Sequence, residues 1–127
     1  MLHNQASAAT ITNILPPVSA SATSNATSST GHWLDVRPYD GEILVTVSTG
    51  ALTGSMVGKL QSGTDANGTS AADITGATFA NVSTANQTRT YSLDPKKVVG
   101  GFLGFVGTIT TGPILIGVTA GGKKKYV

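Results

Sequence analysis

The stretch Gly101–Ala120, GFLGFVGTITTGPILIGVTA, constrains the fold of this chain more than any other segment. Two apolar runs, rich in the branched and aromatic residues that suit a pleated surface, flank Thr111-Gly112-Pro113. Each glycine inside these runs would weaken a helix by about 1 kcal/mol relative to alanine, whereas in strands glycine marks bulges or close approach of a neighbour. We therefore expect two strands that fold back on each other as a central β-hairpin.

Other segments alternate apolar and polar residues with the period of two that half-buried strands show. Turn-forming residues separate them about every 8–12 positions, which is the spacing of an antiparallel sandwich or jelly roll and not of βαβ units. No segment has the pattern of an amphipathic helix. The further predicted strands are Val18–Thr23, His32–Pro38, Glu42–Thr49, Ser55–Gln61 and Thr88–Leu93, and Ala72–Val82 is either two strands or one strand with a bulge. The fold class predicted is therefore all-β: an antiparallel β-sandwich of the jelly-roll type, with about eight strands.

The N-terminal segment Met1–Pro17 differs in character from the rest of the chain. It mixes small polar and apolar residues and ends in Pro16-Pro17, where two successive prolines fix φ and lack backbone N–H donors. We expect residues 1–17 to form an extended arm and not an inner strand. Because 127 residues fit one domain, residues 18–127 are expected to form a single jelly-roll domain with a short basic C-terminal tail.

Composition and charge exclude several classes of protein. The chain has no cysteine, so disulfides, thiol nucleophiles and cysteine-ligated zinc are ruled out. The formal net charge is +2, but Lys123, Lys124 and Lys125 supply the excess, and without them five basic residues face six acidic ones. A nucleic-acid groove needs a basic face, and a membrane span needs about 18 apolar residues in a row. We expect a soluble, unprocessed protein with neither nucleic acid nor a membrane as partner.

Candidate catalytic groups do not converge in the sequence. His3 and His32 are the only histidines, and His32 and Asp35 would lie on opposite faces of one strand, too far apart to share a proton. The acidic residues are scattered, several of them in apparent turns, where Asp bonds to its own backbone. We therefore expect no catalytic residue, no metal site and no cofactor, and the chain is not predicted to be an enzyme.

Two local features have competing interpretations. Asp65-Ala66-Asn67-Gly68 is similar to the first half of a calcium loop, with Asp73 as a further candidate oxygen ligand, but the bidentate Glu that such a loop needs downstream is missing. A plain turn is therefore favoured over an ion site. Trp33 and Tyr39 are candidates for a sugar-stacking platform, although a tryptophan in a strand more often belongs to a core or an interface.

The C-terminal third of the chain resembles the small jelly-roll cement, or decoration, proteins that coat the capsids of tailed bacteriophages. The resemblance covers a strand ending near a proline and a basic pair, two apolar strands around a Gly-Pro turn, and a short Lys-Tyr terminus. These features are Leu93–Lys97, Phe102–Thr110, Gly112-Pro113, Ile114–Thr119 and Lys123–Tyr126. The resemblance implies a structural virion protein on the outer capsid surface, made in the bacterial host cytoplasm. It further implies a homo-oligomer, a trimer or a dimer, whose partner is the major capsid protein.

Proteins of this family often reach across capsid subunit seams with terminal arms, which implies that both chain ends make contacts. The capsid or inter-subunit contact residues expected on this basis are Ile11, Ile14, Leu15, Pro16, Pro17, Lys123, Lys124, Lys125 and Tyr126. Neighbouring capsid subunits would be clamped and so stabilised. The alternative is a carbohydrate-binding or host-attachment β-sandwich module of a phage virion, with Trp33, Tyr39 and the Asp65–Gly68 loop as its binding surface.

Overall fold

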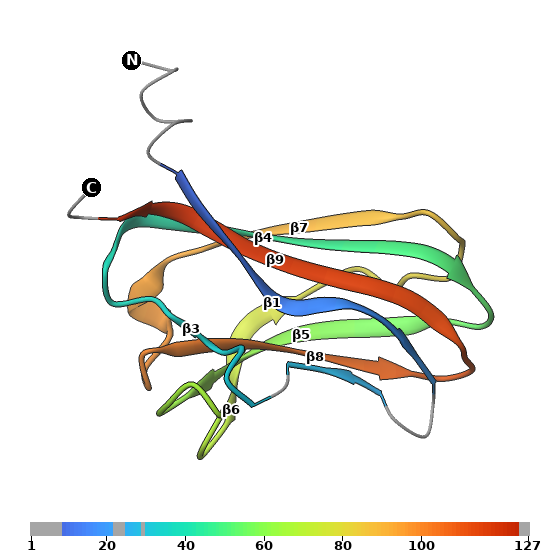
Figure 1. Ribbon diagram of the computed structural model, residues 1–127, viewed down its shortest axis with the longest axis horizontal. Coiled ribbons are helices and arrows are strands. Elements are labelled where there is room, and N and C mark those ends of the chain that lie inside the picture. The colour runs from blue at the N-terminus through green and yellow to red at the C-terminus, as the bar shows by residue number, and fades with distance from the viewer. Residues whose placement is uncertain (1–8, 22–24, 29, 125–127) are drawn as a thin grey trace.

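The computed structural model of the chain describes residues 9–21, 25–28 and 30–124. These residues form nine strands and one short 3-10 turn (Figure 1). The elements are β1 (Ala9–Ala20), β2 (Ala26–Thr27), β3 (Leu34–Asp35), β4 (Tyr39–Leu52), β5 (Met56–Gly63), β6 (Ala72–Thr78), β7 (Thr88–Leu93), η1 (Pro95–Lys97), β8 (Phe102–Ile109) and β9 (Ile114–Lys124). The all-β class predicted from the sequence is confirmed.

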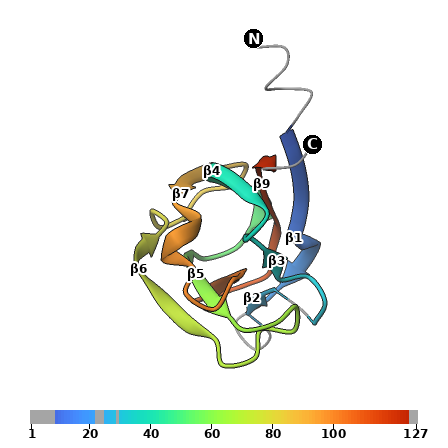
Figure 2. The ribbon, with the colours of Figure 1, turned by 90° about the vertical axis from the view of Figure 1, so that its left-hand side faces the viewer.

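The strands form two antiparallel sheets that pack face to face. Sheet A has the order β1-β9-β4-β7, and sheet B has the order β2-β8-β5-β6, with the short β3 also pairing with β8. When the eight strands other than β3 are renumbered 1 to 8 along the chain, sheet A has the order 1-8-3-6 and sheet B has the order 2-7-4-5. This is the strand order of a jelly roll. Figure 2, which looks along the strands, shows the two sheets curving around a common interior. The predicted jelly-roll sandwich is therefore confirmed.

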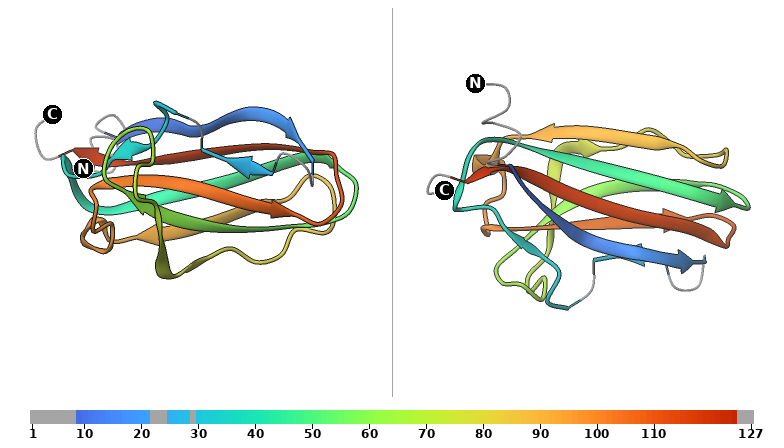
Figure 3. Two further views of the ribbon diagram at one scale, coloured as in Figure 1. Left: turned by 90° about the horizontal axis from the view of Figure 1, so that it is seen from below. Right: turned by 45° about the horizontal axis from the view of Figure 1, so that its top comes forward.

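The predicted central hairpin is wrong. β8 lies in sheet B and pairs with β5, whereas β9 lies in sheet A between β1 and β4. The connection at residues 110–113 therefore crosses from one sheet to the other, as the views in Figure 3 show. A hairpin and a crossover share the same local pattern, because both join two alternating strands by a tight turn. Here the apolar residues of the two strands face each other across the core and not side by side.

Residues 9–17 belong to the sheet, which corrects the arm predicted for residues 1–17. β1 pairs with β9 from Ala9, opposite Lys123, to Ala20, opposite Ile114. The register shifts on either side of Leu15, and the second shift contains Pro16-Pro17. Prolines are tolerated at this position because β1 is an edge strand, where a missing N–H leaves no neighbour unpaired. Residues 1–8 lie outside the described part of the chain.

Two other segments differ in detail from the prediction. His32–Pro38 contributes only the two residues of β3, so the alternation predicted for it does not hold, and both Trp33 and Val36 are buried. Ala72–Val82 forms one strand, β6, with a register shift against β5, followed by an isolated bridge between Val82 and Met56. Of the two options left open for this segment, one strand with an irregularity is the one observed.

The core between the sheets is built around Phe105 of β8. Gly58 and Gly107 lie opposite each other on β5 and β8, and a Cβ at Gly58 would come within 2.6 Å of the Phe105 ring. The ring also packs against Phe79, with centroids 5.9 Å apart, and Phe79 meets Tyr91 of sheet A edge to face at 6.2 Å. This line of aromatic rings joins the two sheets on the side of β6 and β7.

Trp33 packs on the outer side of sheet B. A Cβ at Gly104 of β8 would lie 2.5 Å from the indole. A Cβ at Gly68, in the loop between β5 and β6, would lie 2.4 Å from it. The indole Nε1 donates a hydrogen bond to the carbonyl oxygen of Ser28 at 3.2 Å. Ser28 lies between β2 and β3, and its hydroxyl accepts from the backbone N–H of Phe105 at 2.8 Å. Trp33 therefore holds the β2–β3 segment and the 64–69 loop against the sheet.

We expect the Gly104→Ala substitution to destabilise the fold by about 1–3 kcal/mol, because the added methyl group overlaps the buried Trp33 ring. Val57→Ala is the control, since Val57 is 50% exposed on the same sheet and the substitution adds no atoms. Urea unfolding followed by tryptophan fluorescence measures both free energies of unfolding. Equal stability of the two variants would show that Trp33 is not tightly held by Gly104.

Candidate functional site

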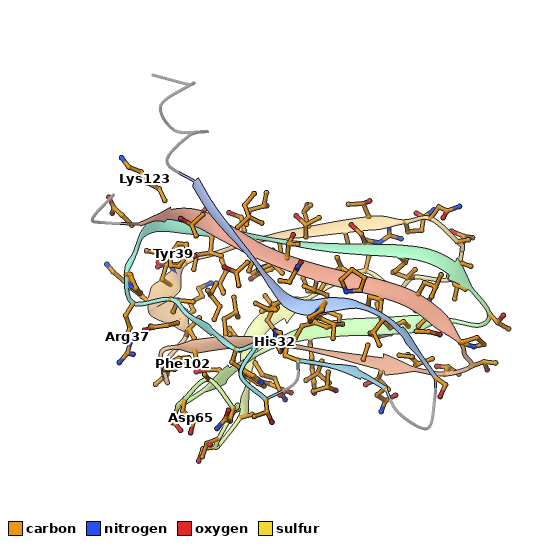
Figure 4. The ribbon with its side chains drawn as sticks, viewed as in Figure 1. His32, Arg37, Tyr39, Asp65, Phe102 and Lys123 are labelled. Atoms are coloured by element: carbon orange, nitrogen blue, oxygen red, sulfur yellow. The ribbon has the colours of Figure 1, made fainter. Side chains whose placement is uncertain are left out.

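Both ends of the described chain lie at the same end of the sandwich (Figure 1). Ala9, where β1 begins, is opposite Lys123 near the end of β9, and Lys123 is also opposite Asp40 at the start of β4. We call this region the terminal end, and it comprises Ala9, residues 36–42, residues 94–99 and Lys123–Lys124. Figure 4 shows Lys123, Tyr39 and Arg37 grouped there.

An open pocket of about 650 Å³ lies at the terminal end. The segment that leads into β4 forms one wall, and the turn around η1 forms the other. The charged residues that line the pocket are Arg37, Asp40, Glu42, Asp94 and Lys96, and Val36, Tyr39 and Val98 are among the remainder. The lining combines carboxylate, ammonium, guanidinium and phenol groups and holds no histidine, cysteine or serine. The mixture of both charges suits a surface that meets another macromolecule.

Local hydrogen bonds fix the shape of this pocket. Arg37 makes two hydrogen bonds to the Asp35 carboxylate, at 2.8 and 2.9 Å, and its guanidinium lies 5.2 Å from the centre of the Phe102 ring. The hydrogen bond and the charge of Asp35 raise the pKa of Arg37. Burial raises the pKa of Tyr39 above 10.0, although a hydrogen bond with Thr12 opposes this shift, so the phenol is neutral at physiological pH. The Asp94 carboxylate accepts from the Lys96 backbone N–H at 3.0 Å and caps η1.

Val99 is a contact candidate that the sequence did not reveal. Its side chain is 92% exposed, the largest value among the exposed large hydrophobic residues of the described chain, and it follows the exposed Lys96 and Lys97. Its neighbour Val98 is 4% exposed. Two adjacent valines give no local signal of which one is buried, because that depends on how the 3-10 turn meets β4. Single exposed hydrophobic residues are common on protein surfaces, so Val99 is a candidate because of its position beside the exposed lysines and next to Val98 of the pocket lining.

The contact residues predicted from the sequence have different locations in the structure. Ile14 and Leu15 are buried in the protein's own core, so neither side chain is available to another molecule. Ile11 is 71% exposed and Pro17 is also exposed, whereas Pro16 is half-buried. Lys123 is exposed and Lys124 is the last residue of β9. Lys125 and Tyr126 lie outside the described residues.

The Asp65–Gly68 loop is held together by its own hydrogen bonds. The Asp65 carboxylate accepts from the Thr69 hydroxyl at 2.7 Å, from the Thr69 N–H at 3.2 Å and from the Asn67 N–H at 2.9 Å. These bonds, those of Thr69 first, hold the pKa of Asp65 below 3.8. Asp73 instead accepts from Lys59 at 3.0 Å and Gln61 at 2.8 Å on the neighbouring strand. The loop is thus built as a turn, and its carboxylate is engaged by donors of the same loop.

The other candidate groups do not form a site. Trp33 and Tyr39 are 6% and 3% exposed, so neither offers a ring face to a sugar. His32 is exposed, Asp35 is engaged with Arg37, and His3 lies outside the described residues. Within the described ranges, no three His, Asp or Glu side chains lie close enough together to hold a metal ion. In the same part of the chain, no helix has the length and apolar character needed to cross a membrane.

Comparisons with known proteins bear on the fold. No protein-family model matches the chain, and no curated protein matches its sequence. Among solved structures, it is similar to the SPBc2 prophage-derived protein YomS, with 13% identity, a TM-score of 0.50, and coverage of 90% of this chain and 93% of that one. A Clostridium thermocellum xylanase 10B structure, comprising CBM22-1 and GH10 modules with xylohexaose, matches at 16% identity and TM-score 0.46, over 94% of this chain but 25% of that one. At such identities, the similarity to YomS shows a shared β-sandwich fold.

The Asp65 loop predicts a pH dependence of stability. Because folding lowers the pKa of Asp65, its contribution is present above 3.8 and is lost as the pH falls through the lower folded-state pKa. Urea unfolding should show wild type more stable than Asp65→Asn at pH 7, with the difference shrinking below pH 3.8. A difference that does not change with pH would contradict this role. Thermal stabilisation by calcium in wild type, lost in Asp65→Asn, would contradict the assignment as a plain turn.

Proposed function

We propose that this protein is a structural virion protein, a decoration protein that binds the outer surface of a phage capsid and clamps neighbouring major capsid subunits. The observation that carries the proposal is the terminal end. Both ends of the described chain, the mixed-charge pocket and Val99, the most exposed large hydrophobic side chain among the described residues, lie at this one end of a jelly roll. A surface of this kind recognises a partner protein by shape and by complementary charge.

The opposite end of the sandwich has a different character. Its turns, at residues 50–55, 83–87 and 110–113, contain no charged residue. Backbone hydrogen bonds tie these turns together, from Thr53 to Pro113, from Asn86 to Gly50 and from Thr110 to Ser55. The molecule therefore has one end rich in charges of both signs, where both ends of the described chain lie. At the opposite end the turns are uncharged, and the Arg89 guanidinium is held there by Gln87 and Asn81. We infer that the terminal end meets the capsid and the opposite end faces the solvent.

The energy of one such contact is modest. Burying Val99 against a capsid subunit would contribute about 1.5–3 kcal/mol before the cost of ordering the contact. The exposed lysines add attraction to acidic surface, which salt screens over about 10 Å. A clamp gains strength because one oligomer binds several subunits at once, so that the second contact forms at high effective concentration. The proposed mechanism is mechanical stabilisation and not chemical turnover.

Two further observations support the proposal without testing it. The jelly-roll fold is the one that the C-terminal resemblance to decoration proteins implies. A prophage-derived protein has a similar sandwich over nearly its whole length.

The proposal predicts that saturating protein binds matched, expanded, bare capsids and raises the temperature at which they release their genome. Val99→Asp should weaken capsid binding about tenfold, because it replaces a buried hydrophobic contact with a charge. Val57→Asp is the matched control: it makes the same substitution at a 50%-exposed valine on sheet B, away from the terminal end. Co-sedimentation with capsids measures the affinities.

Failure of the wild-type protein to bind, or to shift the release temperature, would overturn the proposed function. If Val57→Asp and Val99→Asp weaken binding equally, the capsid contact does not lie at the terminal end. Circular dichroism on both variants establishes that each one is folded before its binding is compared.

A further inference from the structure

The outer face of sheet A is uncharged over most of its length. The inward residues of β9, such as Ile116 and Val118, are buried, so the residues between them point outward. The same alternation holds on β4, where Ile43, Val45 and Val47 are buried. The outward residues of the two central strands are Glu42, Leu44, Thr46, Ser48 and Gly50 on β4, and Leu115, Gly117, Thr119, Gly121 and Lys123 on β9. Thr88, Thr90 and Ser92 of β7 continue this face on one side, and the Ser92 hydroxyl donates a hydrogen bond to the Glu42 carboxylate near the terminal end.

The register of β4 and β9 sets large and small residues side by side on this face. Leu44 lies opposite Gly121, and at the other end of the face Leu115 lies beside Gly50, whose Cβ would be 3.5 Å from that of Leu115. Between these two pairs, Thr46 is opposite Thr119, and Ser48 is opposite Gly117. Each leucine therefore has a glycine as its neighbour on the adjacent strand.

We propose that the outer face of sheet A binds the same face of a second copy of this chain, about a two-fold axis that runs along the strands between β4 and β9. This axis places β9 of one copy over β4 of the other. Each outward residue therefore faces the partner's copy of its own neighbour on the adjacent strand. Leu44 then faces the partner's Gly121, and Leu115 faces the partner's Gly50. A shallow groove of about 290 Å³ would receive the partner's leucine; its lining is uncharged apart from Glu42 and consists of Ile11, Glu42, Leu44, Thr46, Thr119, Gly121 and Gly122.

The same two-fold axis brings opposite charges of the two copies together. Lys123 and Asp40 lie opposite each other on β9 and β4 at the terminal end of the face, so the two-fold axis sets Lys123 against the partner's Asp40. Within the described residues, neither side chain belongs to an ion pair of its own chain. The centre of the face is uncharged and its charges lie at the rim, which is the usual arrangement of a protein–protein interface. When this face packs against its own copy, each lysine meets an aspartate, so like charges do not face each other.

The flat area of the whole face is close to, and slightly below, what a standard dimer interface buries. Four strands of 12, 11, 14 and 6 residues make up sheet A. With about 4.8 Å between strands and about 3.3 Å per residue, the face measures about 19 by 35 Å, or about 700 Å². A standard interface buries about 800 Å² on each partner. In sheets packed face to face, the strands of the two sheets cross at about 30°. The cross-strand pairs of β4 and β9 that lie nearest the axis therefore make the closest contacts with the partner.

The outer face of sheet B offers no such surface. Trp33 and the 64–69 loop cover part of it, and Lys59 on β5 is paired with Asp73. An axis along the strands also points both terminal ends of the dimer in the same direction, so that both can reach one capsid surface. The dimer itself does not rest on the proposed capsid binding.

The test is the oligomeric state of the purified full chain, measured by sedimentation velocity over a series of micromolar concentrations. Wild type should be a dimer. Leu44→Arg should raise the dimer dissociation constant by about a hundredfold, because the symmetry buries two unpaired charges in the interface. Val57→Arg is the matched control, since Leu44 and Val57 are 52% and 50% exposed on opposite sheets, and it should remain a dimer. Leu115→Arg should raise the dissociation constant by a similar factor, and it replaces Leu44→Arg in the test if that variant does not fold.

A wild type that is monomeric or trimeric would overturn the proposal, as would equal dissociation of the Leu44→Arg and Val57→Arg variants. A monomeric wild type whose capsid binding is lost in Leu44→Arg would assign this face to the capsid and not to a second copy. Because the sedimentation measurement uses no capsid, its result is independent of the proposed function.

A charge exchange tests the register of the dimer. Lys123→Asp should weaken the dimer about two- to tenfold at low salt, because it sets two carboxylates against each other. Combining Lys123→Asp with Asp40→Lys should restore the wild-type affinity. If the double variant is no tighter than Lys123→Asp alone, the two copies are not related by this axis.

Discussion

The ring of Phe105 occupies space that exists only because β5 and β8 carry glycine at facing positions. Gly58 and Gly107 let the ring lie against the sheet, and Phe79 and Tyr91 continue the contact to the other sheet. This packing sets how closely the two sheets approach, since interiors are filled to the density of organic crystals. With both inner faces buried, the surfaces left for other molecules are the outer face of sheet A and the ends of the sandwich.

Much of the fold could be predicted from the sequence, because burial on one face forces a period of two on every long strand. Ile114, Ile116 and Val118 show this pattern, and all three are buried. The pattern does not reveal which strand is the neighbour. The turn at residues 110–113 serves a crossover between sheets as well as it would a hairpin. Residues 9–17 were hard to place for a related reason: Pro16-Pro17 excludes an inner strand but is acceptable at a sheet edge, where β1 lies.

The candidate sites were less predictable, because they depend on which residues the register brings together. Ile14 and Leu15 have the composition of exposed anchors, but they lie in the protein's own core. Val98 and Val99 are adjacent and identical, and only the second is exposed. The pairing of leucine with glycine on sheet A arises between strands more than 60 residues apart in the chain, so no local pattern records it. Ile11, Pro17 and Lys123 are exposed, and their role as contact residues stays a prediction.

The two prolines in β1 have a consequence for assembly. An edge strand with a full set of free N–H and C=O groups is a template on which another strand can add, and such addition has no natural end. Pro16 and Pro17 interrupt the row of donors in the middle of β1, where the register also shifts. Growth along this edge is therefore blocked, and association through a face is a closed event that stops at a fixed number of copies. Under the proposed function, this limit would keep the many copies that coat a shell from joining edge to edge before they reach it.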